Sequence, residues 1–121
     1  MKRNVIVADS DTEQCASLCR LIDGQGYQAL PAHSMDALKQ LLAERESLAV
    51  FIDIDTVQID NRSIRDITIE YPGTCCFGMS KEAFHPNLEG AICYHMYACI
   101  RKPIDEEDLL YWLRSAEEDA S

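Results

Sequence analysis

Acidic residues, a serine and a lysine follow the apolar segments of this sequence at points where they could form one site. They are Asp9, Ser10, Asp11, Asp53, Asp55, Thr56, Ser80 and Lys102. Carboxylates brought together repel one another, and Mg²⁺, which prefers hard oxygen ligands, relieves that repulsion. A lysine and a hydroxyl suit the oxygens of a phosphoryl group, and an aspartate can carry an acyl phosphate. These residue types predict a Mg²⁺ and phosphoryl site with Asp53 as its nucleophile.

The apolar segments that precede these residues are predicted to be parallel strands, because they alternate with amphipathic helical patterns. The predicted strands are 5–8, 27–30, 48–52, 75–79 and 97–100. The predicted helices are 12–24, one capped by Ser34, one through Ile64 and Ile67, 87–96, and one capped by Asp105. Right-handed crossovers then give an α/β fold with a doubly wound five-stranded parallel sheet of order 2-1-3-4-5 and helices on both faces. Ligands of such sheets bind at the carboxyl ends of the strands, where the polar residues lie.

Length and composition indicate a single domain over residues 1–121, and the charge disfavours two classes of binding partner. The 21 acidic residues outnumber the 11 basic ones, for a net charge of −10, which argues against direct binding of nucleic acid or of an anionic membrane. No apolar run reaches the length of a membrane span, and the N-terminus lacks the apolar stretch of a signal peptide. We therefore expect a cytoplasmic protein whose six cysteines are reduced and mostly packed as small apolar side chains.

The order of these motifs resembles the receiver domain of two-component response regulators, which has the chemotaxis-protein fold. The resemblance covers nearly the whole chain and is carried by the segments 5–11 and 48–53, by Ser80 and by Lys102-Pro103. It implies that Asp53 accepts a phosphoryl group from a histidine kinase or a phosphotransfer protein. It also implies the other roles: Mg²⁺ held by Asp9, Ser10, Asp53 and the backbone carbonyl of Asp55, phosphoryl oxygens bound by Ser80 and Lys102, and a cis peptide bond before Pro103.

Four positions differ from that family's usual pattern. Ser10 stands where the second acid of the metal-binding pair is expected, and Lys81 where a small residue follows the hydroxyl. Cys99 replaces an aromatic switch residue, and Val57 stands where proline is common. The missing acid leaves a second function open, because the same fold can serve as a pseudo-receiver, an interaction module that works without phosphorylation.

A third alternative is a phosphatase of the haloacid-dehalogenase type, because Asp53, Asp55 and Thr56 also match that family's first motif, D-x-D-x-T. That family needs a further acidic pair after another strand, and only one predicted helix follows Lys102. A flavin-binding protein of similar strand order is rejected, because Asp9 and Asp11 would repel the phosphate of the flavin.

The last predicted helix carries a wide apolar stripe that includes Trp112. Tryptophan and tyrosine dominate binding hot spots, so Trp112 with Tyr97 and Tyr111 could anchor an output domain, a partner protein or a second copy of the chain. By the resemblance, this is the face formed by the fourth helix, the fifth strand and the fifth helix. The alternative is that Trp112 only packs over the margin of the core.

Overall fold

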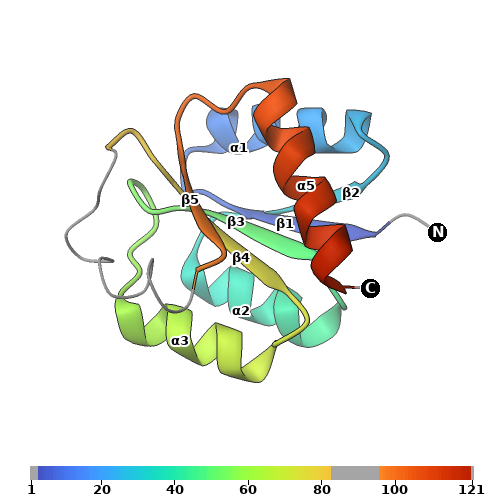
Figure 1. Ribbon diagram of the computed structural model, residues 1–121. Helices are drawn as coiled ribbons and strands as arrows, with labels where there is room; N and C mark the ends of the chain where they lie inside the picture. The colour runs from blue at the N-terminus through green and yellow to red at the C-terminus, as the bar shows by residue number, and fades with distance from the viewer. Residues whose placement is uncertain (1–2, 83–95, 121) are drawn as a thin grey trace.

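A five-stranded parallel sheet forms the centre of the molecule (Figure 1). The computed structural model describes residues 3–82 and 96–120. The strands are β1 (Asn4–Ala8), β2 (Gln28–Ala32), β3 (Ala49–Asp53), β4 (Cys75–Ser80) and β5 (Ala98–Arg101). Their spatial order is β2-β1-β3-β4-β5, and every neighbouring pair is parallel. This is the fold class that the sequence predicts.

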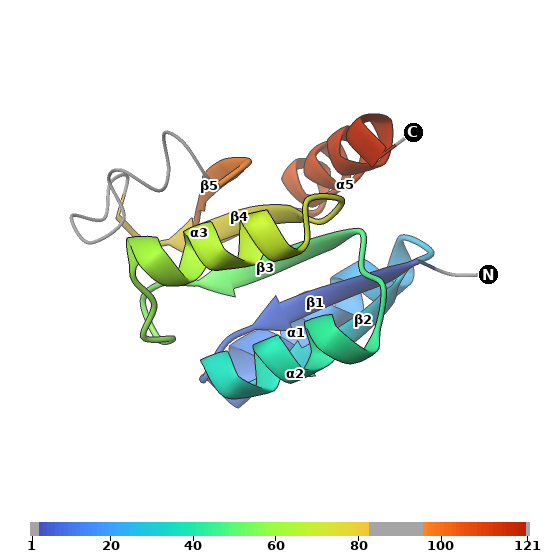
Figure 2. The same cartoon turned by 90° about the horizontal axis from the view of Figure 1, so that it is seen from below.

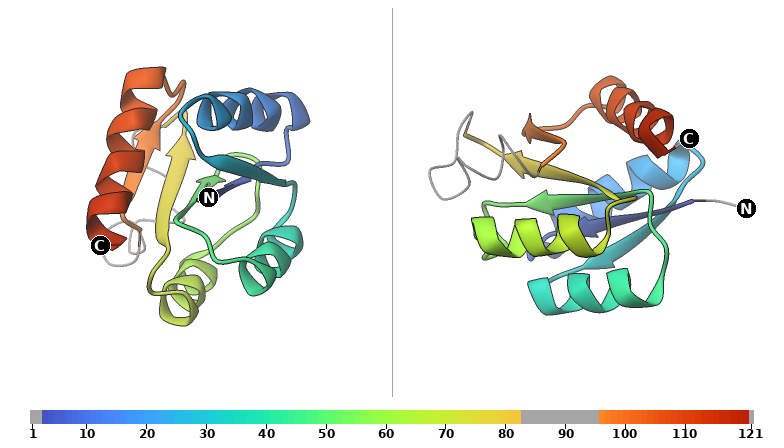
Figure 3. Two further views of the ribbon diagram at one scale, coloured as in Figure 1. Left: turned by 90° about the vertical axis from the view of Figure 1, so that its right-hand side faces the viewer. Right: turned by 60° about the horizontal axis from the view of Figure 1, so that its bottom comes forward.

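In the described part of the chain, two pairs of helices cover the two faces of the sheet (Figures 1 and 2). The helices are α1 (Thr12–Gly24), α2 (Met35–Glu44), α3 (Asn61–Glu70) and α5 (Glu106–Ala120). α1 and α5 lie on one face, and α2 and α3 on the other, as the end-on view in Figure 3 also shows. The helix predicted over 87–96 falls almost entirely outside the described residues and stays a prediction.

Polar side chains fix where the helices begin. Ser34 accepts a hydrogen bond from the backbone N–H of Ala37, and Asp60 caps α3 in the same way. Asp105 accepts from the N–H of Asp108 at the start of α5. Each cap satisfies a backbone donor that the first turn of a helix leaves unpaired. The caps that were predicted at Ser34 and Asp105 are therefore confirmed.

The sheet separates two apolar cores, so its central strand is buried on both sides. All five residues of β3 are buried. On the α1 and α5 side, Phe51 stacks on Phe77 with ring centroids 4.8 Å apart, while Ile52 belongs to the core under α2 and α3. Burying a side chain of this size contributes roughly 1.5–3 kcal/mol. Packing on both faces holds the carboxyl end of β3, and with it Asp53, in a fixed place.

The second strand lies later in the chain than the predicted 27–30. β2 ends at Ala32, which is the register partner of Ala8. Tyr27 instead packs into the core just before the strand, after a turn in which Gly26 has φ 93°, a conformation that glycine adopts without steric cost. In the sequence, Pro31 indicated the end of a strand, because proline has no backbone N–H to donate. An edge strand tolerates proline, since one of its two sides pairs with no other strand.

Gly78 allows a buried methionine to approach β4 closely. A Cβ at this position would lie 2.8 Å from the sulfur of Met96, which is closer than such atoms approach one another. Any larger residue at this position would therefore have to displace the end of the Met96 side chain. None of the described helices is long and apolar enough to cross a membrane.

Candidate functional site

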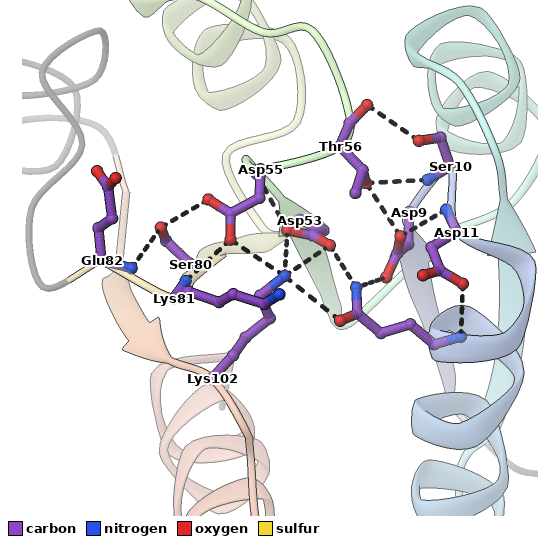
Figure 4. A network of polar contacts seen from close by, with 11 residues as sticks. Asp9, Ser10, Asp11, Asp53, Asp55, Thr56, Ser80, Lys81, Glu82 and Lys102 are labelled. Carbon is purple, nitrogen blue, oxygen red and sulfur yellow. Dashed lines mark hydrogen bonds and ion pairs between the residues drawn. The ribbon is translucent and has the colours of Figure 1, made fainter.

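The predicted site residues meet at the carboxyl edge of the sheet (Figure 4). Asp9 follows β1, Asp53 ends β3, Ser80 ends β4 and Lys102 follows β5. Asp9, Asp53 and Ser80 are each at most 1% exposed. Parallel strands place these residues together because all their carboxyl ends lie at the same edge. The peptide bond between Lys102 and Pro103 is cis, as predicted.

Lys102 is the central cation of this edge. Its ammonium nitrogen lies 3.0 Å from both carboxylate oxygens of Asp53 and 3.1 Å from Oδ2 of Asp55. The side chain is only 9% exposed. Burial by itself would lower the pKa of Lys102, but the hydrogen bonds that its ammonium donates to Asp53 and Asp55 outweigh burial and raise the pKa above its usual value. Lys102 therefore stays charged and balances two carboxylates at once.

The Asp55 carboxylate lies in a pocket of three donors. One oxygen accepts from the hydroxyl of Ser80 at 2.8 Å, and the other accepts from the backbone N–H of Lys81 at 2.9 Å and pairs with Lys102. Burial would raise the pKa of Asp55, but the hydrogen bonds from Lys81, Ser80 and Lys102 together hold it below the usual value. The carboxylate is therefore ionised while it occupies this pocket.

Gln14, in the first turn of α1, lies between the two buried carboxylates. Its amide nitrogen donates to Oδ2 of Asp9 and to Oδ2 of Asp53. Its amide oxygen lies 3.4 Å from the ammonium of Lys102. One neutral side chain therefore links the carboxyl ends of β1 and β3 to the lysine that follows β5.

Ser10 and Asp11 make contacts on the outer side of Asp9. The Ser10 hydroxyl donates to the backbone carbonyl of Thr56 at 3.0 Å, and the Thr56 hydroxyl donates to Asp9. Asp11 caps α1 by accepting from the N–H groups of Glu13 and Gln14. Asp11 is therefore employed as a helix cap, and the Ser10 hydroxyl is directed at the loop after β3.

The donor set of Asp9 and Asp53 fits Mg²⁺ in its chemistry. Two buried carboxylates converge on one point, which the amide nitrogen of Gln14 now occupies. Mg²⁺ is commonly held by one or two carboxylates and keeps several waters, so two carboxylates are a sufficient protein contribution. Among residues 3–82 and 96–120, no group of three His, Cys, Asp or Glu side chains is arranged to hold a metal. Gln14 would have to leave its position for a cation to reach the pair.

An apolar cavity gives access to this edge from the α1 side. Its volume is about 430 Å³. The lining residues are Asp9, Gln14, Ser17, Leu18, Leu21, Met79, Lys81, Lys102, Pro103 and Ile104. Leu18 and Ile104 make its wall apolar, while Lys102 and Gln14 lie where it meets the polar edge.

Sequence reasoning found the strand-end residues, including Thr56, whose hydroxyl donates to Asp9. It missed Gln14, which also contacts Asp9, and the backbone N–H of Lys81, which donates to Asp55. One sequence signal was present, because Asp11 and Gln14 have the three-residue spacing of a capping box. In the structure Gln14 points to the carboxylates, and the Asp11 N–H donates to Asp9 instead.

A second group of side chains lies on the α1 and α5 side of the sheet, at β4, β5 and α5. Trp112 is half-buried and its ring contacts Phe77, Tyr97 and Tyr111 with centroid distances of 5.7, 6.2 and 4.9 Å. Tyr97 is 39% exposed and Tyr111 61% exposed. We call these four residues the aromatic group. Trp112 thus covers the margin of the core and also supports two exposed tyrosines.

Comparisons with known proteins agree on the fold. No family model matches the sequence, and no curated protein matches it significantly. Solved structures do match. A CheY-like receiver domain protein from Methanospirillum hungatei has a TM-score of 0.87 and 17% identity, over 98% of this chain and 97% of that one. The signal receiver domain of an HD domain-containing protein from Pseudomonas fluorescens has a TM-score of 0.87 and 25% identity, over 99% and 98%.

A longer protein contains the same fold as one part. NtrX from Brucella abortus matches with a TM-score of 0.83 and 20% identity, over 99% of this chain but 27% of that one. With the strand order and the strand-end residues described above, these matches establish that the chain has the fold of the response regulator receiver domains.

Proposed function

We propose that this chain is a two-component signalling receiver that accepts a phosphoryl group on Asp53 from a histidine kinase or a phosphotransfer protein. The observation that supports this most directly is the pairing of Lys102 with both oxygens of Asp53, at 3.0 Å, at a buried edge that also holds Asp9 and Ser80. A carboxylate fixed beside a charged ammonium and a hydroxyl is suited to phosphoryl transfer, which depends on positioning and charge neutralisation.

In the proposed reaction an Asp53 oxygen attacks the phosphorus of the donor. The bond from phosphorus to the donor breaks, and its electron pair leaves with the donor group. Lys102 and the Ser80 hydroxyl bind the phosphoryl oxygens. Bound Mg²⁺ would neutralise phosphoryl charge. Asp9 and Asp53 would hold it, with the Ser10 hydroxyl and the Asp55 carbonyl as the other expected ligands.

The aromatic group is the proposed output surface. Tyr97 and Tyr111 are exposed and are supported by Trp112, and aromatic side chains of this kind are frequent anchors of interfaces. An output domain, a partner protein or a second copy of the chain would bind there. The proposed role is regulatory rather than enzymatic, and the net charge of −10 disfavours direct contact with nucleic acid or with an anionic membrane.

A phosphorylation-independent pseudo-receiver is the second candidate. It is favoured by the side chains that already occupy the edge, because Gln14 lies between Asp9 and Asp53 and Asp55 takes the hydrogen bonds of Ser80 and Lys81. A third reading, the phosphatase, needs a further strand with an acidic pair. In the described part of the chain β5 is the last strand in sequence, followed by α5.

Intact-mass spectrometry tests the proposed function. Wild type and Asp53→Asn are incubated with phosphoramidate and millimolar Mg²⁺. We expect one phosphoryl group on wild type and none on Asp53→Asn. Glu82→Gln, which changes an exposed acid near the same edge, serves as the control and should be modified like wild type. An unmodified wild type would favour the pseudo-receiver.

A further inference from the structure

The donors that surround Asp55 form a complete pocket for an oxyanion. They are of three kinds: the Ser80 hydroxyl, the Lys81 backbone N–H and the Lys102 ammonium, at 2.8, 2.9 and 3.1 Å from the carboxylate. They come from the ends of β4 and β5, which pair in the sheet through Ser80 and Arg101. Charged acceptors form the strongest hydrogen bonds in proteins, so this set of donors is well suited to an anionic group with several oxygens.

The Asp55 carboxylate, which occupies this pocket, lies on a turn and can rotate away without disturbing the core. Asp55 lies in the turn after β3, and its side chain is 23% exposed, whereas that of Asp53 is fully buried. Its backbone N–H donates to Oδ1 of Asp53 at 3.0 Å, and this bond does not depend on where the Asp55 side chain points. Rotation of the Asp55 side chain toward solvent would free all three donors while the turn stayed in place.

Asp55 and Asp53 also share one cation. Lys102 pairs with both carboxylates, so Asp53 and Asp55 depend on the same ammonium. A phosphoryl group on Asp53 would add negative charge next to Asp55 and would require Ser80 and Lys102. The two anions cannot use these donors together, because like charges at such distances repel strongly.

We propose that the Asp55 carboxylate is a built-in ligand of this oxyanion pocket, and that an external oxyanion enters only by displacing it. As applied to phosphoryl transfer, the inference rests on the proposed function. The docked carboxylate then slows phosphorylation of Asp53 and holds Ser80 and Lys102 in the positions that a bound oxyanion would require.

Sulfate binding tests the pocket without any phosphorylation. Backbone amide NMR of wild type, Asp55→Ala and Asp66→Ala is recorded in phosphate-free buffer and then with increasing sulfate. Asp66 is an exposed acid of α3, and its substitution removes the same charge away from the pocket. We expect the Lys81 amide of Asp55→Ala to move on sulfate addition with a dissociation constant at least about tenfold lower than in wild type. The Asp66→Ala protein should behave like wild type.

The rate of phosphorylation provides the second measurement. Phosphoramidate is added to the same proteins and to Asp55→Asn, which keeps the shape of the side chain but loses its charge. We expect the initial rate to rise about tenfold in Asp55→Ala and by a smaller factor in Asp55→Asn, because the asparagine still accepts a hydrogen bond from Ser80 or Lys81. Unequal responses of this kind would show that both charge and volume of Asp55 exclude the donor.

The two measurements separate the two ideas. If Asp55→Ala binds sulfate no more tightly than wild type and Asp66→Ala do, the proposal that Asp55 is a built-in ligand is wrong, whatever the phosphorylation rates are. If it does gain affinity but no variant takes up phosphate, the pocket inference stands and the proposed phosphoryl acceptor fails. Equal phosphorylation rates in wild type, Asp55→Ala and Asp66→Ala would overturn the role of Asp55 in excluding the donor and leave Asp53 as the acceptor.

Discussion

The carboxyl edge of the sheet and the aromatic group hold their side chains in opposite ways. At the edge the polar atoms are paired with one another, and no buried side-chain nitrogen or oxygen among the described residues lacks a hydrogen-bond partner. In the aromatic group, Tyr111 and Tyr97 remain 61% and 39% exposed, although Trp112 holds both rings in place.

The difference concerns what a ligand must do in order to bind. At the edge an incoming ion replaces an internal partner, because Gln14 lies between the carboxylates and Asp55 fills the donor pocket. At the aromatic group a partner only covers surface that is already arranged. Binding to the edge is therefore expected to be weakened by competition, while binding to the aromatic group is expected to change little with the state of the edge.

Removal of Lys102 is expected to have the largest effect, because it breaks the pairing that defines the edge. Lys102→Ala leaves the fully buried Asp53 beside Asp9 without an ammonium. Losing one partner of a buried ion pair costs about 3 kcal/mol or more, and we expect urea denaturation to show a loss of about 3 kcal/mol in the free energy of unfolding. Lys39→Ala, at an exposed position of α2, should change it by less than about 0.5 kcal/mol.

The double variant Lys102→Ala with Asp53→Asn sharpens this test. It removes the stranded charge, so part of the lost stability should return. If Lys102→Ala alone is no less stable than Lys39→Ala, the carboxylates do not depend on this cation, and the edge is not the tightly paired region described above.

Addition of a carboxylate at position 10 is expected to change metal binding next most strongly. Ser10→Asp places a second acid beside Asp9, and we expect Mg²⁺ affinity to rise about tenfold, or about 1.4 kcal/mol. The new side chain cannot donate to the Thr56 carbonyl as the Ser10 hydroxyl does, so it should turn toward Asp9. Calorimetric titration with Mg²⁺ measures the change.

A matched variant, Ala16→Asp, adds the same charge at an exposed position of α1. It should change the affinity much less, because Ala16 is not part of the cavity lining that includes Asp9 and Gln14. Equal gains in the two variants would mean that only the overall charge matters. No gain in Ser10→Asp would mean that position 10 does not face the cation.

Removal of the amide between the carboxylates is expected to have a smaller effect in the same direction. Gln14→Ala frees Oδ2 of Asp9 and of Asp53, and a hydrogen bond donated by a neutral amide contributes about 1 kcal/mol. We therefore expect Mg²⁺ affinity to rise roughly fivefold in a calorimetric titration. Gln40→Ala, on the exposed side of α2, is the control. Weaker Mg²⁺ binding in Gln14→Ala would instead make Gln14 part of the metal site.

The fold and the membership of the edge could be predicted from the sequence because both follow from chain-wide patterns. Buried strands such as β3 appear as unbroken apolar runs, and the polar residue after each run marks one edge of a parallel sheet. The errors lie where the pattern is weak. β2 was placed too early, because Tyr27 resembles a strand residue while Pro31 resembles a strand end.

The direction of each polar side chain could not be predicted. The role expected of the Asp55 backbone carbonyl stays a prediction, and nothing in the sequence indicated that the Asp55 carboxylate reaches Ser80 and Lys81. Gln14 carried the signal of a helix cap, yet it binds Asp9 and Asp53. Such choices depend on three-dimensional competition among donors and acceptors, which spacing along the chain does not encode. The topology of the sheet therefore determines which residues meet at the edge, whereas side-chain rotamers determine which of their polar atoms contact one another.

The aromatic group tests the other half of the comparison, and the expected effect of the edge on it is the smallest. Cys99 stands where an aromatic switch residue would link the two regions, and it is half-buried beside Gly78. Where a second copy binds through Tyr97, Tyr111 and Trp112, we expect beryllofluoride with Mg²⁺ to change the dimer dissociation constant by less than about twofold, or about 0.4 kcal/mol. Sedimentation of wild type, Tyr111→Ala and Trp112→Ala, each with and without beryllofluoride, measures this.

Tyr111→Ala should weaken the dimer without loss of fold, since Tyr111 is exposed, whereas Trp112→Ala also removes a contact with Phe77. A monomer in every sample would eliminate self-association, and a dimer that forms only with beryllofluoride would show that the surface is made by the edge rather than preformed.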